Sequence, residues 1–162
     1  KVYAAGDCVE SIQLARVADH EAQVAARNIL ADINDGRGAE ITYDTVPAVL
    51  FTYPQYGMVG ATEDSLKEKG IPYRKNAANA LRWPTYRRVG MADAGFKVLA
   101  DDSGRILGAH ILSDDAAGLL ALFRSAMING TSVGDLYWQS MMTPYPSRES
   151  DIIYMLKPLL DS

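Results

Sequence analysis

A long repeat of apolar and polar positions near the start of the chain predicts a helix over about residues 11–33. Small apolar residues recur there at three- and four-residue spacing and so share one helical face; they are Ala15, Ala18, Ala22, Ala25, Ile29 and Ile33. Because most are alanine, whatever packs on this face is expected to approach the backbone closely. Two glycines in Asn34–Gly38 indicate the helix end. Residues 1–5 are typical of a strand end, closed by Gly6–Asp7.

The middle of the chain has the pattern of alternating strands and turns. Residues 46–53 are apolar and rich in strand formers, which predicts a strand. Thr62 is a suitable amino-terminal cap for a short helix that ends at Gly70. Residues 71–79 are expected to form another strand, and the arginine-rich residues 81–89 an irregular link.

The last third of the chain predicts a hairpin followed by helices. Apolar and polar positions alternate over residues 96–101, a turn follows, and residues 106–112 form the second strand. A helix is expected from Asp114 or Asp115 to 129, a shorter one over 132–139 and a last one over 147–156. Strands and helices occur in runs, so the predicted class is α+β, an antiparallel sheet packed with helices.

Length and charge limit the possible functions. The 162 residues fit one domain plus part of another, with a predicted boundary between 1–42 and 43–162. A net charge of -4 argues against nucleic acid as a partner. No apolar run approaches the roughly 20 residues that would span a membrane. Cys8 is the single cysteine, is expected to be a small buried residue, and suits a cytoplasmic protein.

The strand end and the long helix form the first candidate site. Gly6 would let a ligand approach the backbone, and the Asp7 carboxylate could accept hydrogen bonds from a hydroxylated ligand. The helix start behind them favours electronegative atoms. The alternative interpretation is a plain turn with a helix cap.

Four stretches together resemble the pyridine nucleotide–disulfide oxidoreductase family, and dihydrolipoamide dehydrogenases and mercuric reductases within it. The run Val2–Cys8 resembles the family's second FAD-binding motif, and Pro47–Gly60 the opening of its dimerisation domain. Residues 95–99 and 105–111 are similar to the central hairpin of that domain.

The resemblance implies a cofactor and partners. Gly6 and Asp7 would contact FAD, with Asp7 bonded to its ribityl chain, and Leu14 and Ala15 would lie by the flavin ring. NAD(P)H would be the co-substrate, and the protein a homodimer. The family's glycine-rich FAD loop, redox cysteine pair and NAD(P) domain would precede Lys1 in the rest of its own chain. We therefore expect the fragment alone to be inactive and unable to hold FAD tightly.

The carboxy-terminal segment departs from the family pattern. Many members carry His-Pro-Thr-x-x-Glu, in which histidine is the acid–base group for the partner's active site and glutamate orients it. Here Tyr145 replaces the histidine and Ser150 the glutamate, and no metal-ligand pattern is present. Tyr145 is a proton donor and a poor base at neutral pH. By the resemblance, the Tyr145–Pro146 bond is expected to be cis.

The other histidines do not restore this dyad. His110 is expected to be structural within the hairpin, and His20 a partly exposed helix residue. Another cluster, arginines with two aromatic residues, is expected to be a solvated or interface edge; it comprises Arg82, Arg87, Arg88, Trp83 and Tyr86.

Three hypotheses about function stay open. The chain is part of an FAD-dependent oxidoreductase, a non-catalytic dimerisation module, or part of a flavoprotein with another acceptor such as a metal ion or quinone. Dimerisation is expected to use the second face of the hairpin and the helix that carries Leu119 and Phe123.

Overall fold

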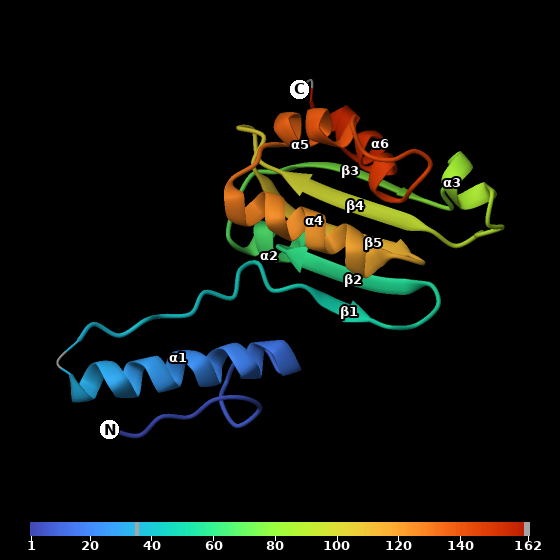
Figure 1. Ribbon diagram of the computed structural model, residues 1–162. Coiled ribbons are helices and arrows are strands. Elements are labelled where there is room, and N and C mark those ends of the chain that lie inside the picture. The colour runs from blue at the N-terminus through green and yellow to red at the C-terminus, as the bar shows by residue number, and fades with distance from the viewer. Residues whose placement is uncertain (35, 161–162) are drawn as a thin grey trace. The chain divides into compact units, whose positions relative to one another are not determined.

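A computed structural model describes residues 1–34 and 36–160 (Figure 1). Asp35 of the predicted helix end, and the terminal Asp161 and Ser162, lie outside the described residues. The chain forms two compact units, Lys1–Val46 and Pro47–Ser162. Among the described helices, none combines the length and the apolar character that crossing a membrane requires.

The first unit contains one long helix. Helix α1 spans Ala15–Ile33, beginning four residues later than predicted because Leu14 has extended backbone angles. Its buried side chains are Val17, Glu21 and Val24 rather than the predicted alanine stripe, of which Ala15 and Ala22 are exposed. The expected strand at residues 1–5 is also absent, since no described strand pairs with it.

The second unit is built on one antiparallel sheet with strand order β1-β2-β5-β4-β3. The strands are β1 (Ala48–Leu50), β2 (Gln55–Gly60), β3 (Arg74–Asn79), β4 (Gly95–Ala100) and β5 (Ile106–Ser113). The β4–β5 hairpin and the strand at 71–79 confirm the sequence predictions, and the α+β class is confirmed with them. The single strand expected over 46–53 was wrong: the chain turns there and returns as β2.

Gly57 helps to explain why β2 escapes prediction, and Gly57 on β2 and Gly108 on β5 both let neighbouring groups approach the sheet closely. A Cβ atom on Gly57 would lie 2.6 Å from the Leu120 side chain, and one on Gly108 would lie 2.2 Å from the Ala61 carbonyl oxygen. These positions therefore need glycine for close approach, and glycine interrupts the apolar alternation that marks a strand.

Six α-helices occur in the described residues, and those of the second unit largely follow the sequence pattern. They are α2 (Glu63–Glu68), α3 (Pro84–Arg87), α4 (Ala116–Asn129), α5 (Val133–Ser140) and α6 (Ile152–Leu156). The Thr62 side chain caps α2, and the Asp115 side chain caps α4. The link at 81–89, expected to be irregular, contains α3, which begins at Pro84, a residue type that suits the first position of a helix. Instead of one helix over 147–156, a 3-10 turn η1 (Glu149–Asp151) precedes α6, and η2 (Lys157–Leu159) follows it.

The core lies between one face of the sheet and helices α4, α5 and α6 (Figure 1). Its buried members include Val59, Tyr86, Val98, Ile111, Leu119, Leu120, Phe123, Ile152, Met155 and Leu156. Leu119 and Phe123 are 0% exposed. These two side chains therefore do not form a free apolar surface, because their face of α4 packs on the sheet, and the use of this helix in dimerisation stays a prediction. The second face of the hairpin is mixed, with Lys97 and His110 paired in register.

Candidate functional site: a clamped carboxy-terminal segment

The turn predicted to approach a flavin is organised by a buried glutamate. The Gly6 N–H donates to Glu21 Oε2 at 2.7 Å, and the Tyr43 hydroxyl donates to Glu21 Oε1 at 2.8 Å. Hydrogen bonds lower the pKa of Glu21; the largest effect comes from the Ser11 hydroxyl, and smaller ones come from the Gly6 N–H and the Tyr43 hydroxyl. Sequence reasoning missed this residue. The sequence offered one signal for it, namely a carboxylate placed among the apolar positions of the helix that forms α1.

The predicted flavin contacts surround the start of α1. Asp7 is exposed, Gly6 has a φ of +79°, Leu14 precedes the first helical residue, and Ala15 is exposed. Cys8, expected to be buried, is exposed, and its thiol donates to the Ala5 carbonyl at 3.2 Å. The turn leaves it on the surface.

These residues fit one part of FAD. The Asp7 carboxylate is a free acceptor for hydroxyl groups, and the first N–H groups of α1 have no partner within the helix. The Gly6 N–H is already committed to Glu21. The sequence contains no G-x-G-x-x-G loop to cradle the pyrophosphate. The arrangement therefore suits the ribityl chain and leaves the phosphates to other groups.

In the second unit, the segment that by resemblance corresponds to the family's dyad begins at an exposed tyrosine. The Tyr145 side chain is 66% exposed, and the Tyr145–Pro146 bond is cis, as predicted. The aromatic ring is thus displayed at the surface while the following residues turn back into the domain.

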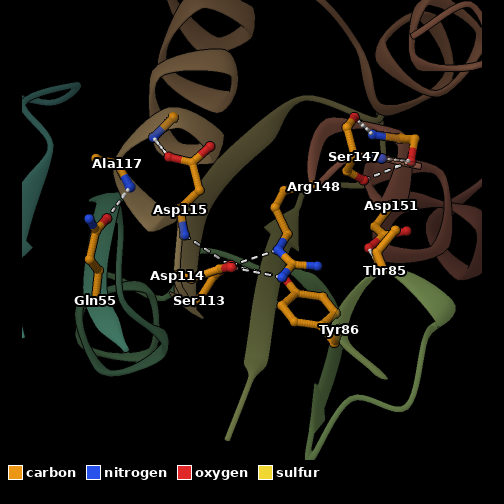
Figure 2. A network of polar contacts seen from close by, with 12 residues as sticks. Gln55, Thr85, Tyr86, Ser113, Asp114, Asp115, Ala117, Ser147, Arg148 and Asp151 are labelled. Atoms are coloured by element: carbon orange, nitrogen blue, oxygen red, sulfur yellow. Dashed lines mark hydrogen bonds and ion pairs between the residues drawn. The ribbon is translucent and has the colours of Figure 1, made fainter. Parts of the chain in front are cut away.

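An arginine three residues later clamps the segment to the end of β5 (Figure 2). Arg148 Nε donates to Asp114 Oδ1 at 2.6 Å, and its Nη2 donates to Oδ2 at 2.8 Å. Arg148 also lies 3.8 Å from the centroid of the Tyr86 ring. The paired guanidinium lowers the pKa of Asp114, and burial raises that of Tyr86. Tyr86, expected at a solvated or interface edge, is buried, whereas Arg82, Arg87 and Arg88 are exposed.

Hydrogen bonds extend this clamp to the beginning of α4 (Figure 2). The Tyr86 hydroxyl donates to Ser113 Oγ at 3.1 Å, and Ser113 Oγ also accepts the Asp115 N–H at 3.3 Å. The Asp115 carboxylate caps α4 by accepting the Gly118 N–H at 3.2 Å. The Ala117 N–H donates to Gln55 Oε1 at 3.1 Å, which adds β2. The network therefore joins β2, the end of β5, α4 and the carboxy-terminal segment.

Ser150 uses its hydroxyl within the segment. It accepts the Ser147 N–H at 3.1 Å and donates to the Ser147 carbonyl at 2.7 Å, while the Ser150 N–H donates to Ser147 Oγ at 3.2 Å. Ser150 is 6% exposed. Its side chain fixes the turn and leaves no carboxylate where the family places glutamate.

The next residue, Asp151, is 0% exposed. The Thr85 hydroxyl donates to its Oδ2 atom, and its Oδ1 atom is buried without a partner among the described residues. Burial raises the pKa of this carboxyl group.

The histidines lie on other elements. His110 is on β5, where its Nε2 is 3.2 Å from the Ala61 carbonyl oxygen and burial lowers its pKa. His20 is exposed on α1. No cluster of three or more potential metal ligands exists in residues 1–34 and 36–160. Among the described residues, the segment therefore holds an exposed phenol with no histidine–carboxylate pair beside it.

Comparisons with known proteins agree with the resemblance seen in the sequence. The family described as "Pyridine nucleotide-disulphide oxidoreductase, dimerisation domain" matches residues 46–152. An uncharacterized 19.7 kDa protein in the mercuric resistance operon of Staphylococcus aureus is 36% identical, covering 96% of this chain and 84% of its own length. A dihydrolipoyl dehydrogenase of Chlamydia muridarum is 34% identical over 84% of the chain, and a mercuric reductase of Bacillus cereus 32% identical over 90%. The chain spans 28% and 22% of these two proteins.

Solved structures share the fold. LpdA from Mycobacterium tuberculosis superposes with a TM-score of 0.81 at 23% identity, over 98% of this chain and 33% of that protein. The HOCl-induced flavoprotein disulfide reductase RclA from Escherichia coli gives a TM-score of 0.79 at 22% identity, over 95% of this chain and 34% of RclA.

Proposed function

Because the chain belongs to the pyridine nucleotide–disulfide oxidoreductase family and carries its dimerisation domain, we propose that it assembles as a homodimer and supplies the dimerisation domain of an FAD- and NAD(P)H-dependent oxidoreductase. The parent enzyme moves electrons from NAD(P)H through FAD to a disulfide or another acceptor. The chain by itself is inactive, because it lacks the redox cysteine pair and the acid–base dyad.

The outward side of α4 supports assembly. One side of this helix completes the core, while the opposite side presents small and apolar residues beside the exposed polar residues Arg124 and Asn129. We define this α4 outer face as Ala121, Leu122, Ser125 and Ile128, all of which are exposed. Leu122 is 38% and Ile128 53% exposed. Small residues allow another helix to approach closely, and burying both large side chains would stabilise association.

Light scattering tests this interface. The wild-type chain is expected to show twice its 17.6 kDa mass at high micromolar concentration. The double substitution Leu122→Glu and Ile128→Glu is expected to give a monomer, because it places like charges in the contact. The far-ultraviolet circular dichroism spectrum of this variant is expected to be unchanged, since both positions are exposed in the single chain.

The matched control replaces an apolar residue that is exposed elsewhere. Leu50 on β1 is 63% exposed, so Leu50→Glu should leave the dimer intact. A monomeric wild type, or a dimer broken only by the Leu50 substitution, would refute assembly through the α4 outer face.

The redox part of the proposal predicts weak flavin binding and no turnover for the chain alone. Asp7 and the start of α1 provide contacts for the ribityl chain only, so a flavin fluorescence titration is expected to show no binding at micromolar FAD. NAD(P)H oxidation with lipoamide, glutathione disulfide, Hg(II) or quinones is expected to stay at background. Tight FAD binding or turnover would contradict this role.

A non-catalytic assembly module is the second candidate. The substitutions Tyr145 and Ser150 at the dyad positions favour it, as does the likeness to the small protein of the mercuric resistance operon. An inactive but stable dimer is compatible with both candidates. Activity of the full-length protein that contains this domain, assayed with the same acceptors, separates them.

A further inference from the structure

One buried carboxyl group is not used by the proposed function. Asp151 in η1 is 0% exposed, and Thr85 in α3, which is 1% exposed, donates its hydroxyl hydrogen bond to Asp151 Oδ2. The Oδ1 atom is buried without a described partner. This contact joins two elements that lie 66 residues apart in sequence.

The charges around Asp151 do not compensate an ionised form. Arg148, whose positive charge acts on Asp151, donates both Nε and Nη2 to Asp114. Tyr86, an ionisable neighbour of both Asp114 and Asp151, is buried beneath Arg148. An ionised Asp151 would therefore be a second carboxylate beside one guanidinium, with a single hydrogen bond. Burying a carboxylate so poorly bonded is costly, whereas the neutral acid is tolerated.

We propose that Asp151 is a protonated lock that fastens the carboxy-terminal segment to α3 and is released when it ionises. The neutral carboxyl group keeps η1 against Thr85. When the proton leaves, the buried charge favours solvent exposure and η1 loosens. Because η1 directly follows Tyr145–Arg148, its release loosens the segment that displays Tyr145.

The direction of the pH effect follows from the raised pKa of Asp151. A carboxyl group with a higher pKa in the folded than in the unfolded state stabilises the fold fully only below its unfolded value. That contribution is lost as pH rises through the folded pKa. The lock therefore closes in acid and opens toward neutral pH, opposite to the behaviour of Asp114, whose pKa is lowered.

Hydrogen exchange of the amides in residues 147–151 tests the lock between pH 5 and pH 8, after correction for intrinsic exchange rates. In the wild type, protection is expected to fall by at least about tenfold as pH rises. The Asp151→Asn variant keeps the shape without the charge, so its protection should stay high and independent of pH. Asp93→Asn, at an exposed aspartate, should behave like the wild type.

Flat protection in the wild type, with lower protection in Asp151→Asn at all pH values, would overturn the lock and make Asp151 an ionised anchor. If Asp151→Asn does not fold, a carbon-13 NMR titration of the Asp151 carboxyl in the wild type decides. A midpoint above the ordinary range for aspartate supports the lock, and one within or below that range refutes it.

Discussion

At the scale of single residues, the partly buried Arg148 is expected to contribute more to the stability of the fold than an exposed arginine does. Its side chain is 11% exposed and combines a bidentate bond to Asp114 with contact to the Tyr86 ring. Removing one member of such a pair leaves the other charge partly desolvated without its partner. Arg88, in contrast, is exposed.

Arg148→Ala is expected to lower the free energy of unfolding by about 3 kcal/mol, a loss that includes the contact with Tyr86. Urea denaturation followed by circular dichroism measures it. The matched variant Arg88→Ala should change stability by less than about 0.5 kcal/mol. Equal losses of unfolding free energy for the two substitutions would show that the bonds of Arg148 to Asp114 and Tyr86 add no stability beyond that of an exposed arginine.

At the scale of elements, a carboxylate on α2 joins this helix to two strands. Glu63 accepts from Lys97 on β4 at 2.6 Å, and from Lys75 on β3 and the Tyr73 hydroxyl at 2.9 Å each. These three hydrogen bonds lower the pKa of Glu63 to about 2, and the bond from Lys97 has the largest effect. Such a group stabilises the fold above its unfolded pKa, and the stabilisation is lost as pH falls through the folded value.

The variant Glu63→Gln is therefore expected to lose about 2 kcal/mol of stability at pH 6 and progressively less toward pH 2. Urea titrations at several pH values measure the difference from wild type. Glu68→Gln, at an exposed position on the same helix, serves as control and should show no such trend. A constant difference for Glu63→Gln from pH 6 to pH 2 would contradict the role of its charge.

At the scale of the whole molecule, the two units differ in how much core each contains. Residues of the second unit alone make up the main apolar cluster, whereas the first unit buries few apolar side chains, Val17 and Val24 among them. A large core supports independent folding, whereas a helix draws most of its stability from packing its apolar face, and the first unit buries little apolar surface against α1.

Removal of residues 1–46 is therefore expected to leave a cooperative thermal transition within about 5 °C of that of the full chain. Differential scanning calorimetry measures it. The peptide 1–46 alone should show little helix by circular dichroism. Loss of cooperative unfolding in the shortened chain would mean that the second unit depends on the first.

The local pattern of the sequence by itself determined much of the second unit. Alternation and turn residues specified the β4–β5 hairpin, and Thr62 and Asp115 marked the starts of two helices through their own side chains. The motifs also identified the family, because four stretches kept their order and spacing. The roles of Asp7, Leu14, Ala15, Tyr145 and Ser150 in a flavoenzyme stay predictions.

Only the tertiary structure decided which surfaces are free and which polar groups meet. Leu119 and Phe123 belong to the core because α4 turns them toward the sheet, whereas Leu122 on the same helix is exposed. Arg148 meets Asp114 across 34 residues of sequence, and Asp151 meets Thr85 across 66. Periodicity reports which residues share a face, but burial and pairing depend on what packs against that face. The state of the Asp151 carboxyl group is therefore a property of the fold rather than of the sequence around it.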